Sequence, residues 1–269
     1  MSATPAETLA DSLRPLTEDP ASAAVLCDID GTLSPIVARP EDSHVQEEIT
    51  ELLDELGRRY ARVACVSGRS AAEARRLVGV DSIAYVGSHG AELLDAGSSE
   101  PQLIDAFAGW EGRVREFVEE QDDRDAEPLR IRLEDKGPIK AFHWRDVPDE
   151  AAAESRLQKV AQEAEAKGFA IHWGRKVLEI RPPVPIDKGQ AVKTMVESSE
   201  VRAALYGGDD VTDLDAFDAL EALVESGDLD AKVCVGVRSD EGPKAIVDRA
   251  DVAVDGVEGF TDVLAALLR

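Results

Sequence analysis

The sequence contains little cysteine and few aromatic residues. Only three cysteines occur among 269 residues, and Phe, Trp and Tyr together make up 4%. Cys27, Cys65 and Cys234 each lie in an apolar, strand-like run, and their spacing matches no metal-binding motif. This pattern argues against a disulfide framework and favours buried free thiols in a reducing compartment. We therefore expect a cytoplasmic protein.

Long apolar runs and an excess of positive charge are also absent. No segment approaches the length of a membrane span, and the first 20 residues lack the basic start and apolar centre of a secretory signal. The formal net charge of −25 argues against nucleic acid or an anionic membrane as a partner, because both attract basic surfaces. The same charge repels an anionic substrate, so a site for one requires positive groups placed locally.

Length and composition describe a globular protein with one large or two smaller domains. Hydrophobic residues make up 43% and charged residues 32% of the chain, which is ordinary for a folded protein. Apolar strand-like runs separated by helical patterns occupy residues 1–104 and again 185–269. These two segments predict the halves of one α/β core with a parallel sheet.

The order of predicted elements changes between residues 105 and 184. A helix precedes two strands joined by the short hairpin signal 135–138, and a second helix and two more strands follow. The expected elements are the helices 105–120 and 149–167 and the strands 129–134, 139–145, 169–173 and 177–181. The order α-β-β-α-β-β does not fit a parallel sheet, so we predict a small α+β domain inserted between the core halves.

The chain is organised around a run in which two aspartates end a buried strand. Asp28 and Asp30 follow the apolar residues 25–27, and a glycine and a threonine come next. Ligands of open α/β sheets bind at the carboxyl ends of strands, and alternation places both carboxylates on one side. Two like charges this close need a cation or a shared proton, and Mg²⁺ fits. One aspartate could then attack phosphorus while the other moves a proton; a turn with locally bonded aspartates is the alternative.

Two later segments offer groups that bind anions. Ser67-Gly68-Arg69 follows the second predicted strand, where a hydroxyl, backbone N–H groups and a guanidinium can bind a phosphate. The alternative is that Ser67 or Ser70 simply caps the next helix. Lys188 begins a predicted helix, where a cation opposes the helix dipole unless an anion lies beside it. An ordinary surface lysine is the alternative there.

Three further carboxylates follow two glycines at the end of a later strand. Asp209, Asp210 and Asp213 complete the metal hypothesis begun at Asp28, since one would coordinate the cation and the others would support it. His89, which follows the third predicted strand, is a lone histidine and is expected to be structural.

With these groups in this order, the chain after about residue 22 resembles the haloacid-dehalogenase-like phosphatases, which have a Rossmann-like core. The resemblance implies that Asp28 is the nucleophile forming an aspartyl-phosphate, and that Asp30 is the acid and then the base. It implies that Ser67 and Lys188 hold the phosphate. It further implies that Mg²⁺ is bound by Asp28, the backbone carbonyl of Asp30 and Asp209, with Asp210 and Asp213 nearby. Substrate contacts are implied for Thr32, Gly68 and Arg69.

More narrowly, the chain is similar to the trehalose-6-phosphate phosphatases. The motifs that carry the similarity are residues 28–36, 67–69, 87–92, 134–137, 143–145, 179–182 and 208–217. The similarity implies that the insert is a cap closing over a disaccharide, and that Glu134, Lys136 and Glu179 hydrogen-bond its distal glucose. A protein recognises a polyhydroxylated sugar through paired hydrogen-bond donors and acceptors. Without the resemblance, these residues would be an ordinary charged hairpin.

The implied reaction is magnesium-dependent hydrolysis of trehalose 6-phosphate, with a trehalose-phosphate synthase as pathway partner. Alternatives are a phosphatase for sucrose phosphate, mannosyl-3-phosphoglycerate or glucosylglycerol phosphate, a phosphomutase, or a non-catalytic sugar-phosphate sensor. Loss of Asp28 or Asp30 would favour the sensor, and both are present.

Overall fold

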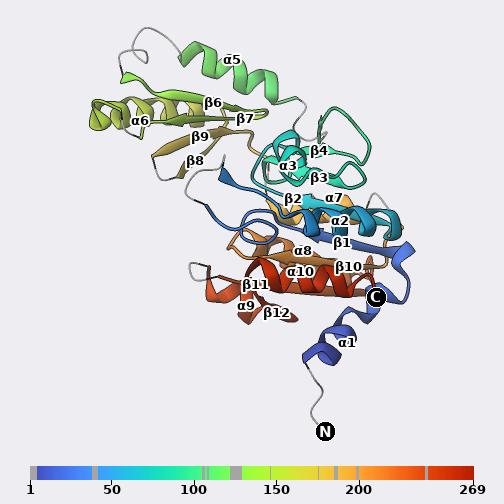
Figure 1. Cartoon of the computed structure of the whole chain (residues 1–269). Helices are drawn as coiled ribbons and strands as arrows, with labels where there is room; N and C mark the ends of the chain where they lie inside the picture. Colours follow the sequence, from blue (N-terminus) through green and yellow to red (C-terminus); the bar gives the residue numbers. More distant parts are fainter. Residues whose placement is uncertain are drawn as a thin grey trace. The chain divides into compact units, whose positions relative to one another are not determined.

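The chain folds around two separate β-sheets (Figure 1). The computed structural model describes residues 5–37, 42–104, 107, 109–121, 129–145, 147–174, 176–184, 187–197, 200–239 and 242–269, with the side chains of 5–8 left out. Contacts divide the chain into a core unit, Met1–Gln102 with Ile186–Arg269, and an inserted unit, Leu103–Pro185.

The core sheet is mostly parallel. Its strands are β1 (Ala23–Cys27), β2 (Arg62–Val66), β3 (Ala84–Gly87), β4 (Glu92–Leu94), β5 (Gln102–Leu103), β10 (Ala203–Gly208), β11 (Ala231–Arg238) and β12 (Val252–Asp255). The order is β12-β11-β10-β1-β2-β3-β4-β5, parallel from β12 to β3, with β4 antiparallel to β3. The central strand β1 is buried throughout, as its continuous apolar sequence predicts.

Helices cover both faces of this sheet. They are α1 (Pro5–Thr17), α2 (Glu47–Arg59), α3 (Ala71–Val78), α7 (Lys188–Glu197), α8 (Asp213–Ser226), α9 (Lys244–Asp248) and α10 (Gly256–Ala266). Apolar residues of α1, α2, α3 and α10 form one buried cluster with the sheet, and those of α7, α8 and α9 form another. The α/β fold class with a parallel sheet is therefore confirmed.

The strand order reverses beside β1. The chain runs from β1 outward through β2 and β3, and β10 then pairs with the other side of β1. Cys27 at the end of β1 aligns with Gly207 of β10, and the Asp28 N–H donates to the Gly207 carbonyl at 2.9 Å. Such a switch point at the carboxyl ends of parallel strands is where α/β folds bind ligands.

The inserted unit is an antiparallel sheet with two helices, α5 (Glu111–Gln121) and α6 (Glu150–Ala166). Its strands are β6 (Arg132–Lys136), β7 (Ile139–His143), β8 (Ala170–Gly174) and β9 (Val177–Arg181), in the order β6-β7-β9-β8. Lys136 pairs with Ile139, so the β6–β7 turn is only residues 137–138. The expected four-residue joint was therefore too long, because Asp135 and Lys136 continue the strand.

The two faces of the inserted sheet differ in character. Phe142, Leu178 and Ile180 belong to the apolar cluster that includes residues of α5 and α6. Glu134, Ala141 and Glu179 align across β6, β7 and β9, and so project from the opposite face. We call this second side the polar sheet face; strand alternation also places Lys136, His143 and Arg181 on it.

Two sequence expectations concern the chain as a whole. The three cysteines are free and buried, as expected. Among the described residues, no helix combines the length and apolar character needed to span a bilayer.

Candidate active site

Asp28 lies at the switch point and is almost completely buried, at 5% exposure. Its Oδ1 is 2.8 Å from Nζ of Lys188, the first residue of α7. Lys188 is itself only 3% exposed. The prediction that Lys188 is more than an ordinary surface lysine therefore agrees with its burial. The cation of α7 and the carboxylate after β1 form one buried ion pair.

Asp213 begins α8 and organises the loop after β10. Its Oδ1 accepts hydrogen bonds from Lys188 Nζ and from the Tyr206 hydroxyl, each at 2.7 Å. Its Oδ2 accepts from the backbone N–H groups of Asp209 at 3.0 Å and Asp210 at 2.9 Å. With two donors on each oxygen, this fully buried carboxylate fixes both the lysine and the loop.

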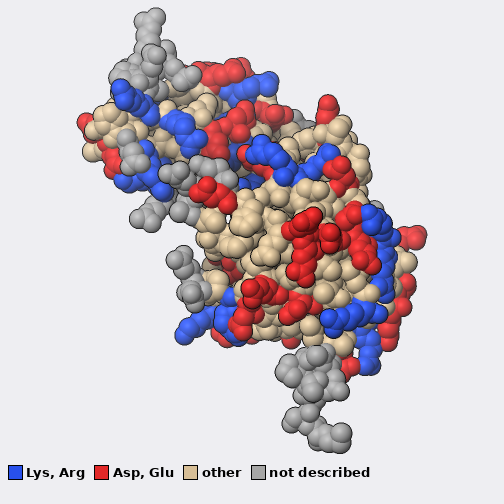
Figure 2. Space-filling model, in the orientation of Figure 1, with Lys and Arg blue, Asp and Glu red and all other residues tan. Residues whose placement is uncertain are grey.

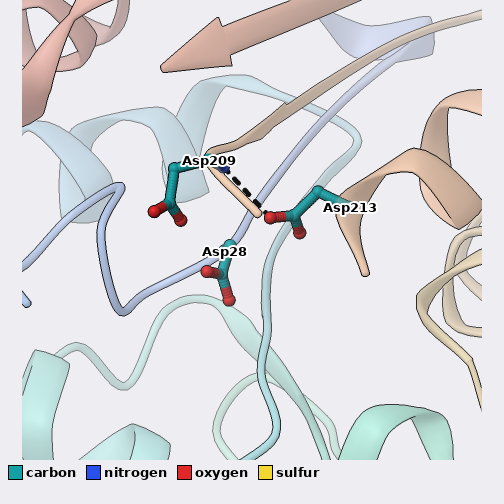
Figure 3. A group of neighbouring side chains, drawn as sticks. All are labelled: Asp28, Asp209 and Asp213. Atoms are coloured by element: carbon teal, nitrogen blue, oxygen red, sulfur yellow. Dashed lines mark hydrogen bonds between the residues drawn. The ribbon is translucent and has the colours of Figure 1, made fainter. Parts of the chain in front are cut away.

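Asp28, Asp209 and Asp213 come together as one acidic group (Figure 3). Each offers a carboxylate oxygen, and these oxygens lie within 4.8 Å of one another. Oδ1 of Asp209 is buried without a hydrogen-bond partner among the described residues. A methyl group on Gly31 would lie 2.1 Å from Asp209 Oδ2, so only glycine fits there. This oxygen-only set, with one carboxylate oxygen unsatisfied, fits a hard divalent cation such as Mg²⁺.

The charge balance of the group points the same way. Burial raises the pKa of Asp28 to about 8, with Asp213 adding to the rise and Lys188 opposing it. Burial and Asp213 likewise raise the pKa of Asp209 to about 7. Burial disfavours the Lys188 cation, but Asp28 and Asp213 outweigh it and raise its pKa. One lysine facing three carboxylates leaves an excess of negative charge, which a bound cation would neutralise.

Asp30 has a separate set of partners. Arg69 donates to both of its carboxylate oxygens, from Nε at 2.7 Å and from Nη2 at 2.7 Å. The Ser43 hydroxyl donates to Asp30 Oδ1 at 3.3 Å and is 2.8 Å from the Ser34 hydroxyl. The hydrogen bond to Asp30 raises the pKa of the Arg69 guanidinium. The sequence analysis did not predict this ion pair, because it assigned Arg69 only to phosphate binding.

The predicted phosphate loop follows β2. Ser67 is 1% exposed, and its hydroxyl accepts from the Arg69 N–H at 3.2 Å. Ser70 is the N-cap of α3, where it forms a capping box with Glu73. The helix-cap alternative therefore applies to Ser70, and Ser67 remains available for the site.

Two further predicted residues differ in their exposure. Asp210 is exposed, and its Oδ1 accepts from the Val211 N–H at 2.7 Å. Thr32 is fully buried, and its hydroxyl has no hydrogen-bond partner among the described residues. The structure does not bring the side chains of Asp210 and Asp30 into the three-carboxylate group.

The predicted sugar-binding residues share the polar sheet face of the inserted unit. Glu134 lies 2.6 Å from His143 Nε2, and Lys136 Nζ donates to Glu179 Oε1 at 3.2 Å. Arg181 also donates to Glu179 Oε2, from Nε at 2.9 Å and from Nη2. Carboxylates and cations thus alternate over one face, which suits recognition of several hydroxyl groups.

Comparison with known proteins agrees with these features. The trehalose-phosphatase family model matches residues 26–250. The chain belongs to the trehalose-phosphatase family. The resemblance predicted from the sequence motifs is therefore confirmed.

Several curated relatives share about a third of the sequence. A trehalose-phosphate phosphatase of Mycolicibacterium paratuberculosis is 34% identical over 231 residues, covering 82% of this chain and 56% of the relative. An uncharacterized glycosyl hydrolase of Mycobacterium tuberculosis is 36% identical over 204 residues, covering 73% of this chain and 15% of the relative. The chain thus spans about half the length of the trehalose-phosphate phosphatase and a small part of the longer protein.

Solved structures share the fold at lower identity. A trehalose-6-phosphate phosphatase related protein superposes with a TM-score of 0.66 at 24% identity, over 91% of this chain and 97% of that one. Aspergillus fumigatus trehalose-6-phosphate phosphatase gives 0.65 at 20% identity, over 99% and 98%. The C-terminal domain of a Candida albicans trehalose synthase regulatory protein gives 0.61 at 13% identity, over 97% and 98%. These likenesses establish the fold.

Proposed function

We propose that this chain hydrolyses trehalose 6-phosphate to trehalose and phosphate through an aspartyl-phosphate on Asp28. The observation that carries the proposal is the buried Asp28–Lys188 pair at the switch point, together with the Asp209 oxygen that has no hydrogen-bond partner in the described part of the chain. A buried nucleophile, a fixed cation and a metal-binding carboxylate are what phosphoryl transfer needs. Family membership and the trehalose-phosphate phosphatase relatives support the substrate.

In the first step, a carboxylate oxygen of Asp28 attacks phosphorus. The bond between phosphorus and the sugar oxygen breaks, and its electron pair stays on that oxygen. Asp30 gives the oxygen a proton, so that trehalose leaves as the neutral alcohol. Ser67 and Lys188 hold the phosphate oxygens during this transfer, and Thr32 and Gly68 are assigned to the same phosphate.

In the second step, Asp30 takes a proton from a water molecule whose oxygen attacks the same phosphorus. The bond between phosphorus and Asp28 breaks, which restores the carboxylate and releases phosphate. Arg69 and Ser43 fix the Asp30 carboxylate, because three hydrogen bonds converge on its two oxygens. Arg69 is thus assigned both to the substrate phosphate and to positioning Asp30.

Asp28, Asp209 and the backbone carbonyl of Asp30 would hold Mg²⁺, with Asp210 and Asp213 supporting them. When bound, the ion neutralises negative charge on the phosphoryl group. The sugar is assigned to Glu134, Lys136 and Glu179, whose pairing on the polar sheet face supports a hydroxyl-binding role. A cytoplasmic location and a synthase partner remain predictions.

The test is phosphate release from trehalose 6-phosphate, sucrose 6-phosphate, glucose 6-phosphate and mannosyl-3-phosphoglycerate, with magnesium and with chelator. Magnesium-dependent preference for trehalose 6-phosphate supports the proposal. Preference for another sugar phosphate keeps the chemistry and discards the sugar assignment. Release from none of them favours a non-catalytic sensor, because the same fold occurs in a protein described as regulatory.

A further inference from the structure

The loop after β3 contains two adjacent residues in the left-handed backbone region. Ser88 has a φ of +51° and His89 a φ of +59°. Side chains other than glycine rarely adopt this conformation, and it persists only where the surroundings enforce it. Other non-glycine residues with positive φ in the described part of the chain, Arg130 and Lys176, are not adjacent to one another. Strain at two successive positions calls for a reason in function.

This strained loop is fastened to the phosphate loop. The Ser88 N–H donates to the Arg69 carbonyl at 2.7 Å, and the His89 N–H donates to the Ser67 carbonyl at 3.0 Å. The Ser88 hydroxyl donates to Glu92 Oε1 at 3.2 Å, and Glu92 Oε2 accepts from the first backbone N–H of α3 at 3.0 Å. Residues 88–89 therefore have a fixed position relative to residues 67–69.

The His89 ring lies against Gly68. A methyl group on Gly68 would be 2.8 Å from both Cε1 and Nε2 of the imidazole. Position 68 therefore accepts only glycine as long as the ring keeps its place, although Gly68 itself has no left-handed φ. The His89 ring is half-buried, and a side chain at position 68 would have to displace it.

We propose that His89 is a further substrate-contacting residue, which donates a hydrogen bond from its imidazole to the phosphate held by Ser67–Arg69. Glycine at position 89 would adopt the backbone more easily, so the benefit of histidine must come from its side chain. A chain with a net charge of −25 needs every local donor it can direct at a dianion. The inference rests on the proposed function and replaces the structural role expected for His89.

The deciding variant is His89→Gly, because a role confined to the backbone shape of the loop and the proposed role predict opposite results. If the residue only shapes the loop, glycine relieves the strain and leaves phosphate binding unchanged. We expect instead that inorganic phosphate, titrated calorimetrically in the presence of Mg²⁺, binds about tenfold more weakly, the effect of one charge-assisted hydrogen bond. The KM for trehalose 6-phosphate should rise by a similar factor while the melting temperature is kept or increased.

Ser88→Gly is the matched control, since it relieves the same strain one residue earlier and keeps the imidazole and the backbone hydrogen bonds to the phosphate loop, losing the hydroxyl's bond to Glu92. Its phosphate affinity should stay within about twofold of the wild type. Equal affinity of His89→Gly and the wild type, or equal losses in both variants, would overturn the inference. If the wild type hydrolyses no phosphate ester but His89→Gly still weakens phosphate binding, the proposed function fails and this inference survives.

Discussion

The buried carboxylates of the core unit and Glu179 of the inserted unit differ in the direction of their pKa shifts. In the core, burial raises the pKa of Asp28 and Asp209, and Lys188 is shared between Asp28 and Asp213. In the insert, burial opposes ionisation of Glu179, yet Arg181 and Lys136 lower its pKa overall. The core site has uncompensated negative charge, whereas this insert carboxylate has two cations of its own.

This difference indicates different ligands. Surplus buried charge suits a divalent cation and the chemistry of a phosphate. A charge-balanced array of donors and acceptors suits a neutral polyhydroxylated sugar, which offers hydroxyl groups and no charge. Figure 2 shows acidic side chains spread widely over the visible surface, with basic ones among them. We therefore propose that the reaction takes place in the core unit and that the inserted unit selects the sugar.

The largest expected effect is that of Asp28→Asn. Turnover of trehalose 6-phosphate and of p-nitrophenyl phosphate should both fall by at least about 10⁴-fold, because the nucleophile is lost for every substrate. The fold should survive, since the asparagine is isosteric and removes one of three crowded carboxylates. Steady-state kinetics and a melting curve check this. Retained turnover with either ester would show that Asp28 is not the nucleophile.

Glu179→Gln should act on one substrate only. We expect kcat/KM for trehalose 6-phosphate to fall about 100-fold, the effect of a lost charged hydrogen bond, and p-nitrophenyl phosphate to change less than about threefold. Asp135→Asn is the control, because Asp135 belongs to the same sheet but its side chain is exposed and pairs with Lys140. An equal loss with both substrates would remove Glu179 from sugar binding.

Tyr206→Phe should lower the stability and the activity of the core unit without changing the preference between the two esters. It removes one of the two donors to Asp213 Oδ1, at a cost of about 1.5 kcal/mol of unfolding free energy. Turnover of both esters should fall together, by about threefold to tenfold, because Lys188 depends on the same carboxylate. Tyr85→Phe is matched to it, since that buried hydroxyl donates to the Val80 carbonyl instead. A similar loss of turnover in Tyr85→Phe would make the effect one of general stability.

Saturating Mg²⁺ should raise the melting temperature of the protein more at high pH than at low pH. The expected difference between the two shifts is about 3 °C. The folded-state pKa values of Asp28 and Asp209 lie near 8 and 7, above the usual value near 4. Without metal, their contribution is therefore fully present below about pH 4 and is lost progressively as the pH rises from there to the folded pKa values near 7 and 8.

Magnesium binds the ionised form, so its effect on melting should grow between pH 5.5 and 8. The growth should be smaller in Asp209→Asn, where Asp28 is the one raised-pKa ligand that still titrates. A magnesium effect independent of pH would contradict the assignment of these carboxylates to the metal.

The sequence predicted the parts of the fold and site that depend on local pattern. The apolar run before Asp28 predicted a buried strand, and the position of polar residues after β1, β2 and β10 placed them at one edge of the sheet. The order of elements in 105–184 likewise predicted an α+β insert outside the parallel sheet, and strands of this segment form a sheet of their own. Regular periodicity and the carboxyl-end rule were sufficient for these.

Contacts between distant side chains were beyond such reasoning. The strands β4 and β5 are two to three residues long, too short to show a period. The Asp30–Arg69 pair joins residues 39 positions apart, and Tyr206 was interpreted only as part of a strand. A buried tyrosine hydroxyl needs a partner, which was the one available signal for its bond to Asp213. The left-handed backbone at Ser88 and His89 had no signal, because neither residue type favours it strongly.

The most direct test of the division between the two units is a ratio. The kcat/KM for trehalose 6-phosphate divided by that for p-nitrophenyl phosphate is measured in the wild type and in the triple variant Glu134→Gln, Lys136→Met, Glu179→Gln. We expect the ratio to fall by at least about 10³-fold while hydrolysis of the aryl ester continues, because the core groups are untouched. An unchanged ratio, with both activities lost or both kept, would contradict it.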